Sequence, residues 1–242
     1  MIIDLLKKSV PEYKLKLTDM GKTLPFRPML VKEEKFISIV TNVSSSFEDK
    51  IKNLCLIIDS CFNNKIKSID LSLNDFQLAL NSIRKKSISE SVNFKMTCPF
   101  TQEMVNVNLN LDSFSVTNLE KKIELNVNDK FIYTFVKPRI KDLIQLEDFP
   151  KSTEDWKKIA VNCLTTIESK EEKIDVLSEK IEEKNNYINF MKTQDFKTAV
   201  NFIKSNAVSF KINYVTSDGE EREIEVNDIS NFLKFFMVIL TL

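Results

Sequence analysis

Apolar residues in three stretches before residue 90 recur at the three- and four-residue spacing of an amphipathic helix. The first stretch begins at Leu30, the second at Phe47 and the third at Leu73. In front of the third, Ser72 and Asp75 stand in the positions of a helix N-cap and its reciprocal acid. The pattern predicts three helices that each bury one face.

A hairpin is predicted in front of these helices. Residues 13–17 alternate polar and apolar as a strand does, and Gly21 supplies a turn. Residues 23–29 can return as a second strand, but Pro25 and Pro28 place it at a sheet edge or at an exit. The stretch therefore predicts a strand–turn–strand unit that leads into the first helix.

Farther along the chain the apolar period changes to two residues. The alternating segments form three pairs: 92–98 with 105–111, 123–127 with 131–135, and 208–214 with 224–226. Short turn sequences such as Asp218-Gly219 separate the partners, which favours hairpins. We expect an α+β fold in which the strands before residue 140 form one antiparallel sheet packed on the three helices.

Residues 153–191 contain neither glycine nor proline and show a seven-residue repeat. The a positions are Ala160, Ile167, Ile174, Ile181 and Ile188, and the d positions are Cys163, Lys170, Leu177, Lys184 and Met191. This repeat predicts a long helix. Two interpretations stay open. The helix lies on its own domain, with a break near Ser169 allowed, or it is a coiled-coil arm or hairpin that meets a partner or a second copy through Ile174, Leu177 and Ile181.

We expect two domains that divide near Pro150. Residues 1–150 contain the helices and the sheet, and residues 151–242 contain the helical arm, the last hairpin and a final apolar helix. That final segment, residues 232–242, includes Phe235 and Phe236 and is too apolar to remain in water. It is expected either to complete the core or to dock on another protein.

Composition narrows the classes of function. The chain carries 35 basic and 35 acidic residues, so a net charge of zero provides no bulk basic signal for nucleic acid or a membrane surface. It has no histidine, which excludes Ser-His and Cys-His catalytic pairs. Its two isolated glycines cannot form a phosphate-binding loop. We therefore expect no enzymatic activity and no cofactor.

The four cysteines, Cys55, Cys61, Cys98 and Cys163, form no Cys-x-x-Cys pair. They are expected to be reduced core thiols and not metal ligands. The opening Met-Ile-Ile-Asp lacks the long apolar core of a signal peptide, so a cytoplasmic location is expected. One catalytic class stays open, a hydrolase that uses two carboxylates. Nothing in the spacing of the acids selects such a pair.

Residues 26–35 read Phe-Arg-Pro-Met-Leu-Val-Lys-Glu-Glu-Lys. Together with the preceding strand pair, this stretch resembles the hub assembly proteins and related hub subunits in the baseplates of T-even-type contractile-tailed phages. The resemblance covers about residues 10–140 and does not extend to the heptad region or the last hairpin. Some relatives carry a Cys-Pro-x-Cys knuckle, where this chain has Cys98-Pro99-Phe100-Thr101. Because the second cysteine is missing, a metal site of those relatives is not expected here.

The resemblance implies a non-enzymatic, chaperone-like factor that binds baseplate hub proteins in the host cytoplasm. A structural hub subunit retained in the virion is the second role that it implies. The candidate partner-binding residues of this stretch are Arg27, Lys32, Glu33, Glu34 and Lys35. A docking role predicts that Arg27→Ala with Glu33→Lys leaves the monomer folded and blocks hub assembly. Local physics offers an alternative, because acids in a first helical turn favour the helix dipole without any partner.

Overall fold

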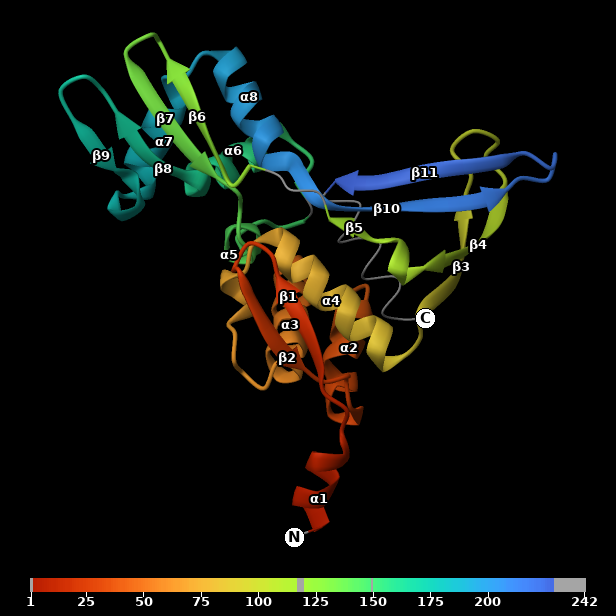
Figure 1. The fold of residues 1–242 in the computed structure, drawn as a ribbon. Helices are drawn as coiled ribbons and strands as arrows, with labels where there is room; N and C mark the ends of the chain where they lie inside the picture. Colours follow the sequence, from red (N-terminus) through yellow and green to blue (C-terminus); the bar gives the residue numbers. More distant parts are fainter. Residues whose placement is uncertain (1, 117–119, 149, 229–242) are drawn as a thin grey trace.

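The structure is a computed structural model that describes residues 2–116, 120–148 and 150–228. It combines helices with short antiparallel sheets, which confirms the expected α+β class. The elements gather in three units that spread apart from a common centre (Figure 1).

The first unit, called the helical unit, contains the predicted hairpin and the three predicted helices. Its elements are β1 (Tyr13–Leu17), β2 (Lys22–Phe26), the 3-10 turn η1 (Val31–Glu33), α2 (Glu34–Thr41), α3 (Phe47–Cys61), the 3-10 turn η2 (Ser68–Asp70) and α4 (Leu73–Ser87). Gly21 closes the hairpin with a φ of +68°, which glycine adopts at little cost. The predicted apolar stripes are buried between the helices, as at Leu54 and Leu80. A further helix, α1 (Ile2–Ser9), projects from this unit (Figure 1).

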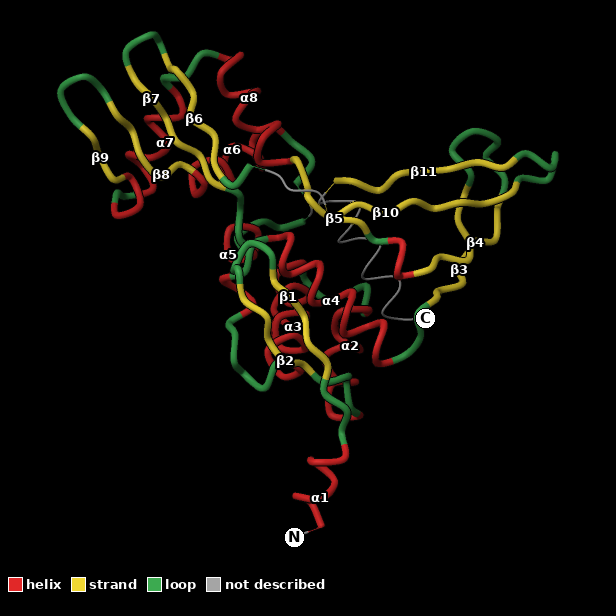
Figure 2. The backbone as a smooth tube through the Cα atoms, in the orientation of Figure 1, coloured by secondary structure: helices red, strands yellow, loops and turns green. Residues whose placement is uncertain are grey.

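The second unit, called the four-stranded unit, is a sheet with helices packed on it. Its elements are β6 (Lys122–Val127), β7 (Phe131–Val136), α6 (Thr153–Cys163), β8 (Leu164–Glu168), β9 (Lys173–Asp175), the 3-10 turn η4 (Val176–Ser178), α7 (Ile181–Asn189) and α8 (Thr193–Lys204). The short helix α5 (Ile140–Ile144), between β7 and α6, packs on α3 and η2 of the helical unit. The strands follow the order β6-β7-β8-β9, all antiparallel. α6 and α8 pack against the strands, while α7 packs against α6 (Figure 2). Because β7 pairs with β8, strands from both sides of residue 150 share one sheet.

The third unit, called the double-hairpin unit, joins two hairpins that are distant in the sequence. Its elements are β3 (Ser91–Thr97), β4 (Met104–Asn110), the 3-10 turn η3 (Leu111–Ser113), β5 (Ser115–Val116), β10 (Ser205–Val215) and β11 (Glu221–Asp228). The predicted alternation is confirmed, since Val105, Val107 and Leu109 are buried between exposed neighbours. β10 packs against both β4 and α4.

Hydrogen bonds join the tips of the two hairpins. The Cys98 Sγ lies 3.3 Å from the Tyr214 hydroxyl, and the Ser217 N–H donates to the Glu103 carboxylate at 2.9 Å. Burial acts to raise the pKa of Cys98, but hydrogen bonds from Thr101 and Tyr214 outweigh it and lower that pKa to about 7. All four cysteines are buried and free of disulfides, as predicted.

The prediction that the strands before residue 140 form a single sheet is wrong. Residues 91–110 form the separate β3–β4 hairpin, whereas residues 122–136 belong to the four-stranded sheet. Alternation shows that a segment is a strand with one buried face, but it carries no information about which strand lies beside it. Besides its predicted hairpin partner, β7 also pairs with the later strand β8, and β10 also pairs with the earlier strand β5; local sequence does not reveal these two additional pairings.

The prediction of one long helix over residues 153–191 is also wrong. Ala160 lies in α6, Ile167 in β8 and Ile174 in β9, while Ile181 begins α7. Ile167 and Ile174 face each other across the β8–β9 hairpin, so their seven-residue separation reflects a tight turn. The Ser169 hydroxyl accepts from two backbone N–H groups of this turn, which needs no glycine.

The physical reason is tertiary pairing. The β-branched run Thr165-Thr166-Ile167 favours a strand. The neighbouring strand β7 pairs with it and places the aromatic Tyr133 opposite Ile167. Residues 153–191 therefore do not form a coiled coil. The predicted final apolar helix, with Phe235 and Phe236, lies outside the described residues. Among the residues that are described, no helix is long and apolar enough to cross a membrane.

Candidate functional site

Arg27 and Glu33 form a buried ion pair at the exit of the N-terminal hairpin. Glu33 is only 1% exposed. Two parallel contacts join the side chains, Nη2 to Oε1 at 2.9 Å and Nη1 to Oε2 at 3.2 Å. A fork-to-fork pair of this kind is among the stronger charged contacts in proteins.

Backbone and hydroxyl groups complete this ion pair. The Leu30 N–H donates to Glu33 Oε2 at 2.7 Å, and the Ser60 hydroxyl donates to Oε1 at 2.6 Å. Arg27 in turn donates to the carbonyl oxygens of Pro28 and Ser60 at 2.8 and 3.1 Å. Burial acts to raise the pKa of Glu33, but the hydrogen bonds from Arg27, Ser60 and Leu30 outweigh it and hold that pKa below its usual 4.5. The pair ties β2, η1 and the end of α3 together.

This geometry changes the expectation for the candidate docking cluster. Because Arg27 and Glu33 are buried, their joint substitution is expected to destabilise the fold and not only to block a partner. Lys32, Glu34 and Lys35 do lie on the surface. Their role in binding a partner stays a prediction.

The candidate residues of the heptad region do not form one helical face. Ile174 is half-buried in β9, opposite Ile167. Leu177 lies in η4 and Ile181 begins α7, and both are exposed. Phe235 and Phe236 lie outside the described residues, so the structure assigns them no position.

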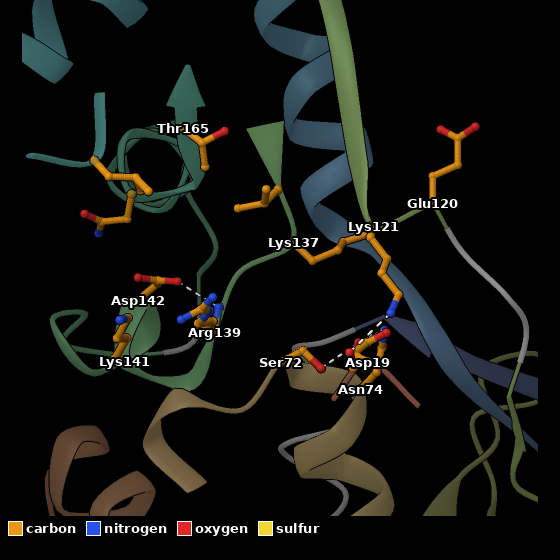
Figure 3. Close-up of a pocket in the computed structure, with 13 residues that line it drawn as sticks. Asp19, Ser72, Asn74, Glu120, Lys121, Lys137, Arg139, Lys141, Asp142 and Thr165 are labelled. Atoms are coloured by element: carbon orange, nitrogen blue, oxygen red, sulfur yellow. Dashed lines mark hydrogen bonds between the residues drawn. The ribbon is translucent and has the colours of Figure 1, made fainter. Parts of the chain in front are cut away.

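A cleft of about 520 Å³ lies between the helical unit and the four-stranded unit (Figure 3). Its lining is strongly charged. The cationic residues are Lys121, Lys137, Arg139 and Lys141, and the acidic residues are Asp19, Glu120 and Asp142. Sequence patterns do not predict this cleft, because its walls come from distant segments that meet only in the folded chain.

Most of these charged groups already serve the fold. Ser72 and Asn74 donate to the Asp19 carboxylate at 2.6 and 3.2 Å. The Asp142 carboxylate accepts from the Arg139 N–H at 2.7 Å and caps α5, while burial raises the pKa of Asp142. Two acids engaged in this way are not arranged as a free acid–base pair.

Lys137 links β7 to the end of α8. Its ammonium group donates to the carbonyl oxygens of Phe202 and Ser205, and it lies 4.1 Å from the centre of the Phe202 ring. Burial lowers the pKa of Lys137 to about 8. Lys137 therefore stabilises the fold by joining β7 to the end of α8.

Each of the three units has an exposed apolar side chain at or near one of its ends or turns. Phe190, which follows α7, is 75% exposed and lies beside the β6–β7 turn, where Asn128 donates to its carbonyl at 3.2 Å. Phe100 at the tip of β3–β4 is 64% exposed and stacks under Arg222. In the helical unit, α1 exposes Ile2, Leu5 and Leu6. Exposed aromatic residues of this kind are typical anchors of protein interfaces.

None of these exposed residues was among the predicted sites. The available signal was an aromatic residue placed in or next to a turn, as in Cys98-Pro99-Phe100. Turn residues are usually polar, so Phe100 and Phe190 each depart from the local rule. Among the described residues, no cluster of three or more cysteine or carboxylate groups could hold a metal ion.

Comparison with known proteins identifies one family. The family model described as "T4 bacteriophage base plate protein" matches residues 10–234. This match includes the stretch at residues 26–35 and all three units, but α1 precedes it. No curated protein and no solved structure matches the chain.

Proposed function

Because the chain belongs to the family of T4 bacteriophage base plate proteins, we propose that it is a non-enzymatic assembly factor for the central hub of the phage tail baseplate. The membership confirms the resemblance of residues 26–35 to baseplate proteins. The hub role and the chaperone-like action are our proposal. The factor would act in the host cytoplasm by transient binding to hub proteins, shielding their interfaces or ordering their addition.

The observation that carries this proposal is the location of the exposed apolar groups. Phe100 lies in the β3–β4 turn and Phe190 lies beside the β6–β7 turn, and these two turns belong to separate units (Figure 1), so one molecule can present both residues to different partners at once. Their side chains contribute nothing to the buried core. An assembly factor needs several accessible contact points, and the three units each offer one.

A catalytic role has less support. The chain contains no histidine, and Asp19 and Asp142 are both engaged in structural hydrogen bonds. We therefore keep the carboxylate hydrolase as an untested alternative that no contact in the cleft favours.

Single substitutions at the projecting ends test the proposal. Phe100→Glu and Phe190→Glu are expected to leave the protein folded and to reduce the yield of complete baseplates in cells infected with phage that carry the variant gene. Electron microscopy of the tail structures and plaque counts measure the yield. Leu56→Glu, at an exposed apolar position on α3, is the matched control. Normal baseplate yield in a variant carrying both end substitutions would rule out this use of the ends.

A structural hub subunit is the second candidate, because the family description names a base plate protein. Quantitative mass spectrometry of purified phage particles separates the two roles. Absence from the particle supports the assembly factor, and a fixed copy number per particle supports the subunit.

A further inference from the structure

β11 is a long strand whose outer edge pairs with no other described strand. It forms one margin of the sheet β11-β10-β5, and its pairing with β10 runs without a bulge from Glu221 to Val226 (Figure 1). β11 contains neither proline nor glycine. Proteins often protect an open edge by making the strand very short or by adding a bulge or a proline. Since β11 has none of these features, its backbone is competent to accept another strand.

The hairpin turn fixes which backbone groups of β11 face outward. The Thr216 N–H donates to the Glu220 carbonyl at 3.0 Å, and every second pair of an antiparallel ladder is bonded in this way. Between residues 221 and 226, the even-numbered residues therefore bond to β10. The odd-numbered residues direct their N–H and C=O groups toward the open edge. These residues are all glutamates: Glu221, Glu223 and Glu225.

The side chains of the three glutamates lie on one exposed face, because alternate residues of a strand share a face. Lys211 forms an ion pair with Glu223 at 2.7 Å, and among the described residues neither Glu221 nor Glu225 has such a partner. Two copies of this edge, paired symmetrically, would place Glu223 opposite itself and Glu221 opposite Glu225. Like charges directly opposite each other destabilise a strand pair, so a second copy of this chain does not fit the edge.

A hollow of about 520 Å³ lies beside these glutamates. It is lined by residues 213–215 of β10 and residues 221–223 of β11. Val215 is directly opposite Glu221 and is 57% exposed. A lysine or arginine can lay its aliphatic part on an apolar group while its charge stays in water beside an acid. The hollow therefore suits a long basic side chain.

We propose that β11 accepts an extended segment of a partner protein as an additional antiparallel strand, with lysine or arginine at every second position. The existing sheet is antiparallel throughout, and antiparallel pairs are slightly the more stable per residue. Acidic charge on the edge disfavours self-pairing and leaves the edge available to a strand of opposite charge. The proposal concerns this edge and does not rest on the assembly-factor role.

The register follows from the direction of the backbone groups. Each basic residue stands directly opposite one of the three glutamates and exchanges two backbone hydrogen bonds with it. The residues between them lie on the face of the half-buried Ile224 and are expected to be apolar. Main-chain hydrogen bonds then provide affinity, and the alternating charges specify the partner.

Fluorescence anisotropy with synthetic peptides tests the edge. The probe is a dye-labelled, end-blocked Lys-Val-Lys-Val-Lys peptide, titrated with the full chain at physiological ionic strength. We expect saturable binding of this peptide and no binding of the matched Glu-Val-Glu-Val-Glu peptide. Equal binding of the two peptides, or binding of neither, overturns the proposal.

Methylated peptides separate strand addition from charge attraction alone. In the proposed register, each lysine N–H points toward β11 and each valine N–H points away from it. N-methylation of the central lysine is therefore expected to weaken binding at least about tenfold, which corresponds to about 1.4 kcal/mol. N-methylation of a valine is the matched control and should leave the affinity unchanged. If both methylated peptides bind like the parent, or if both fail to bind, antiparallel addition to the edge is overturned.

Charge reversal tests whether the peptide binds at β11. Glu221→Lys with Glu225→Lys keeps the ion pair of Glu223, and it is expected to weaken binding of the lysine peptide at least about tenfold. The same variant should instead bind a Glu-Val-Lys-Val-Glu peptide. Glu171→Lys with Glu172→Lys, in the exposed β8–β9 turn, is the control with the same net charge, and thermal melts check that both variants fold. A control that weakens binding as much as the β11 variant overturns the proposal, because the attraction is then not specific to the edge.

Discussion

Glu33→Gln tests whether the buried ion pair stabilises the helical unit. The change removes one negative charge and almost no volume. In the wild type, each Glu33 oxygen accepts two hydrogen bonds, from Arg27 and Ser60 at Oε1 and from Arg27 and Leu30 at Oε2. In the variant, an amide NH2 group replaces one of these oxygens and faces two donors. The Arg27 cation is left buried without a counter-charge.

The expected cost follows from this count. Breaking a buried ion pair by removing one partner costs about 3–5 kcal/mol. Glutamine keeps one acceptor oxygen, so the lower end applies, about 3 kcal/mol. A chain of this size loses about 2–4 °C in midpoint temperature per kcal/mol, which gives a decrease of about 6–12 °C.

Urea unfolding followed by circular dichroism at 222 nm measures the change. Trp156 is the only tryptophan and lies in the four-stranded unit, so its fluorescence reports on that unit separately. Glu34→Gln is the matched control, because the same chemical change is made one residue later at an exposed site. It should stay within about 0.5 kcal/mol of the wild type.

A third variant separates charge burial from packing. Arg27→Met with Glu33→Leu replaces the whole pair by apolar groups and should cost less than the sum of the single changes. If Glu33→Gln is as stable as Glu34→Gln, the ion pair does not stabilise the helical unit and this reasoning is refuted.

Three further predictions concern pH, a turn and the corrected heptad region. Since the pKa of Glu33 is lower in the folded than in the unfolded chain, its stabilisation is complete above pH 4.5 and is lost as the pH falls through the folded value. Urea midpoints from pH 6 to 3 should therefore fall more steeply for the wild type than for Glu33→Gln, and parallel curves would contradict this. Asp75→Asn should cost about 1–3 kcal/mol, because the buried carboxylate accepts from the N–H groups of Asp19 and Met20 at 3.1 and 2.8 Å; an unchanged urea midpoint would contradict it. Insertion of Gly-Gly between Lys170 and Glu171 should leave the fold and its melting cooperativity intact, since a turn accepts residues that a continuous helix does not. A loss of cooperative melting in that variant would count against the turn.

Local rules locate many of the elements. The three helices of the helical unit follow from apolar spacing, and the hairpins follow from alternation with a turn between the strands. Ser72 caps α4 as its position predicts, with its hydroxyl accepting from the Asp75 N–H at 3.2 Å. These features depend on residues within one or two turns of each other, so neighbouring positions are sufficient to specify them.

Two details show where local rules end. The Asp75 carboxylate does not bond back to the cap as a reciprocal acid but accepts from the β1–β2 turn, more than 50 residues away. Arg27 and Glu33 belong to a charged stretch that predicts a surface, yet Ser60 and the end of α3 cover them. The composition of a stretch does not reveal what covers it.

The amino-acid order was therefore enough to establish the α+β class, the hairpins, the first helices and a resemblance to baseplate proteins. Only the tertiary structure decided that residues 164–168 and 173–175 are strands, that the sheets are separate, and that Arg27 and Glu33 form a buried ion pair. The physical reason is the separation along the chain between the residues that interact. Periodicity and capping act between close neighbours, whereas strand partners, burial of charge and exposure of Phe100 or Phe190 depend on segments that meet only when the chain folds.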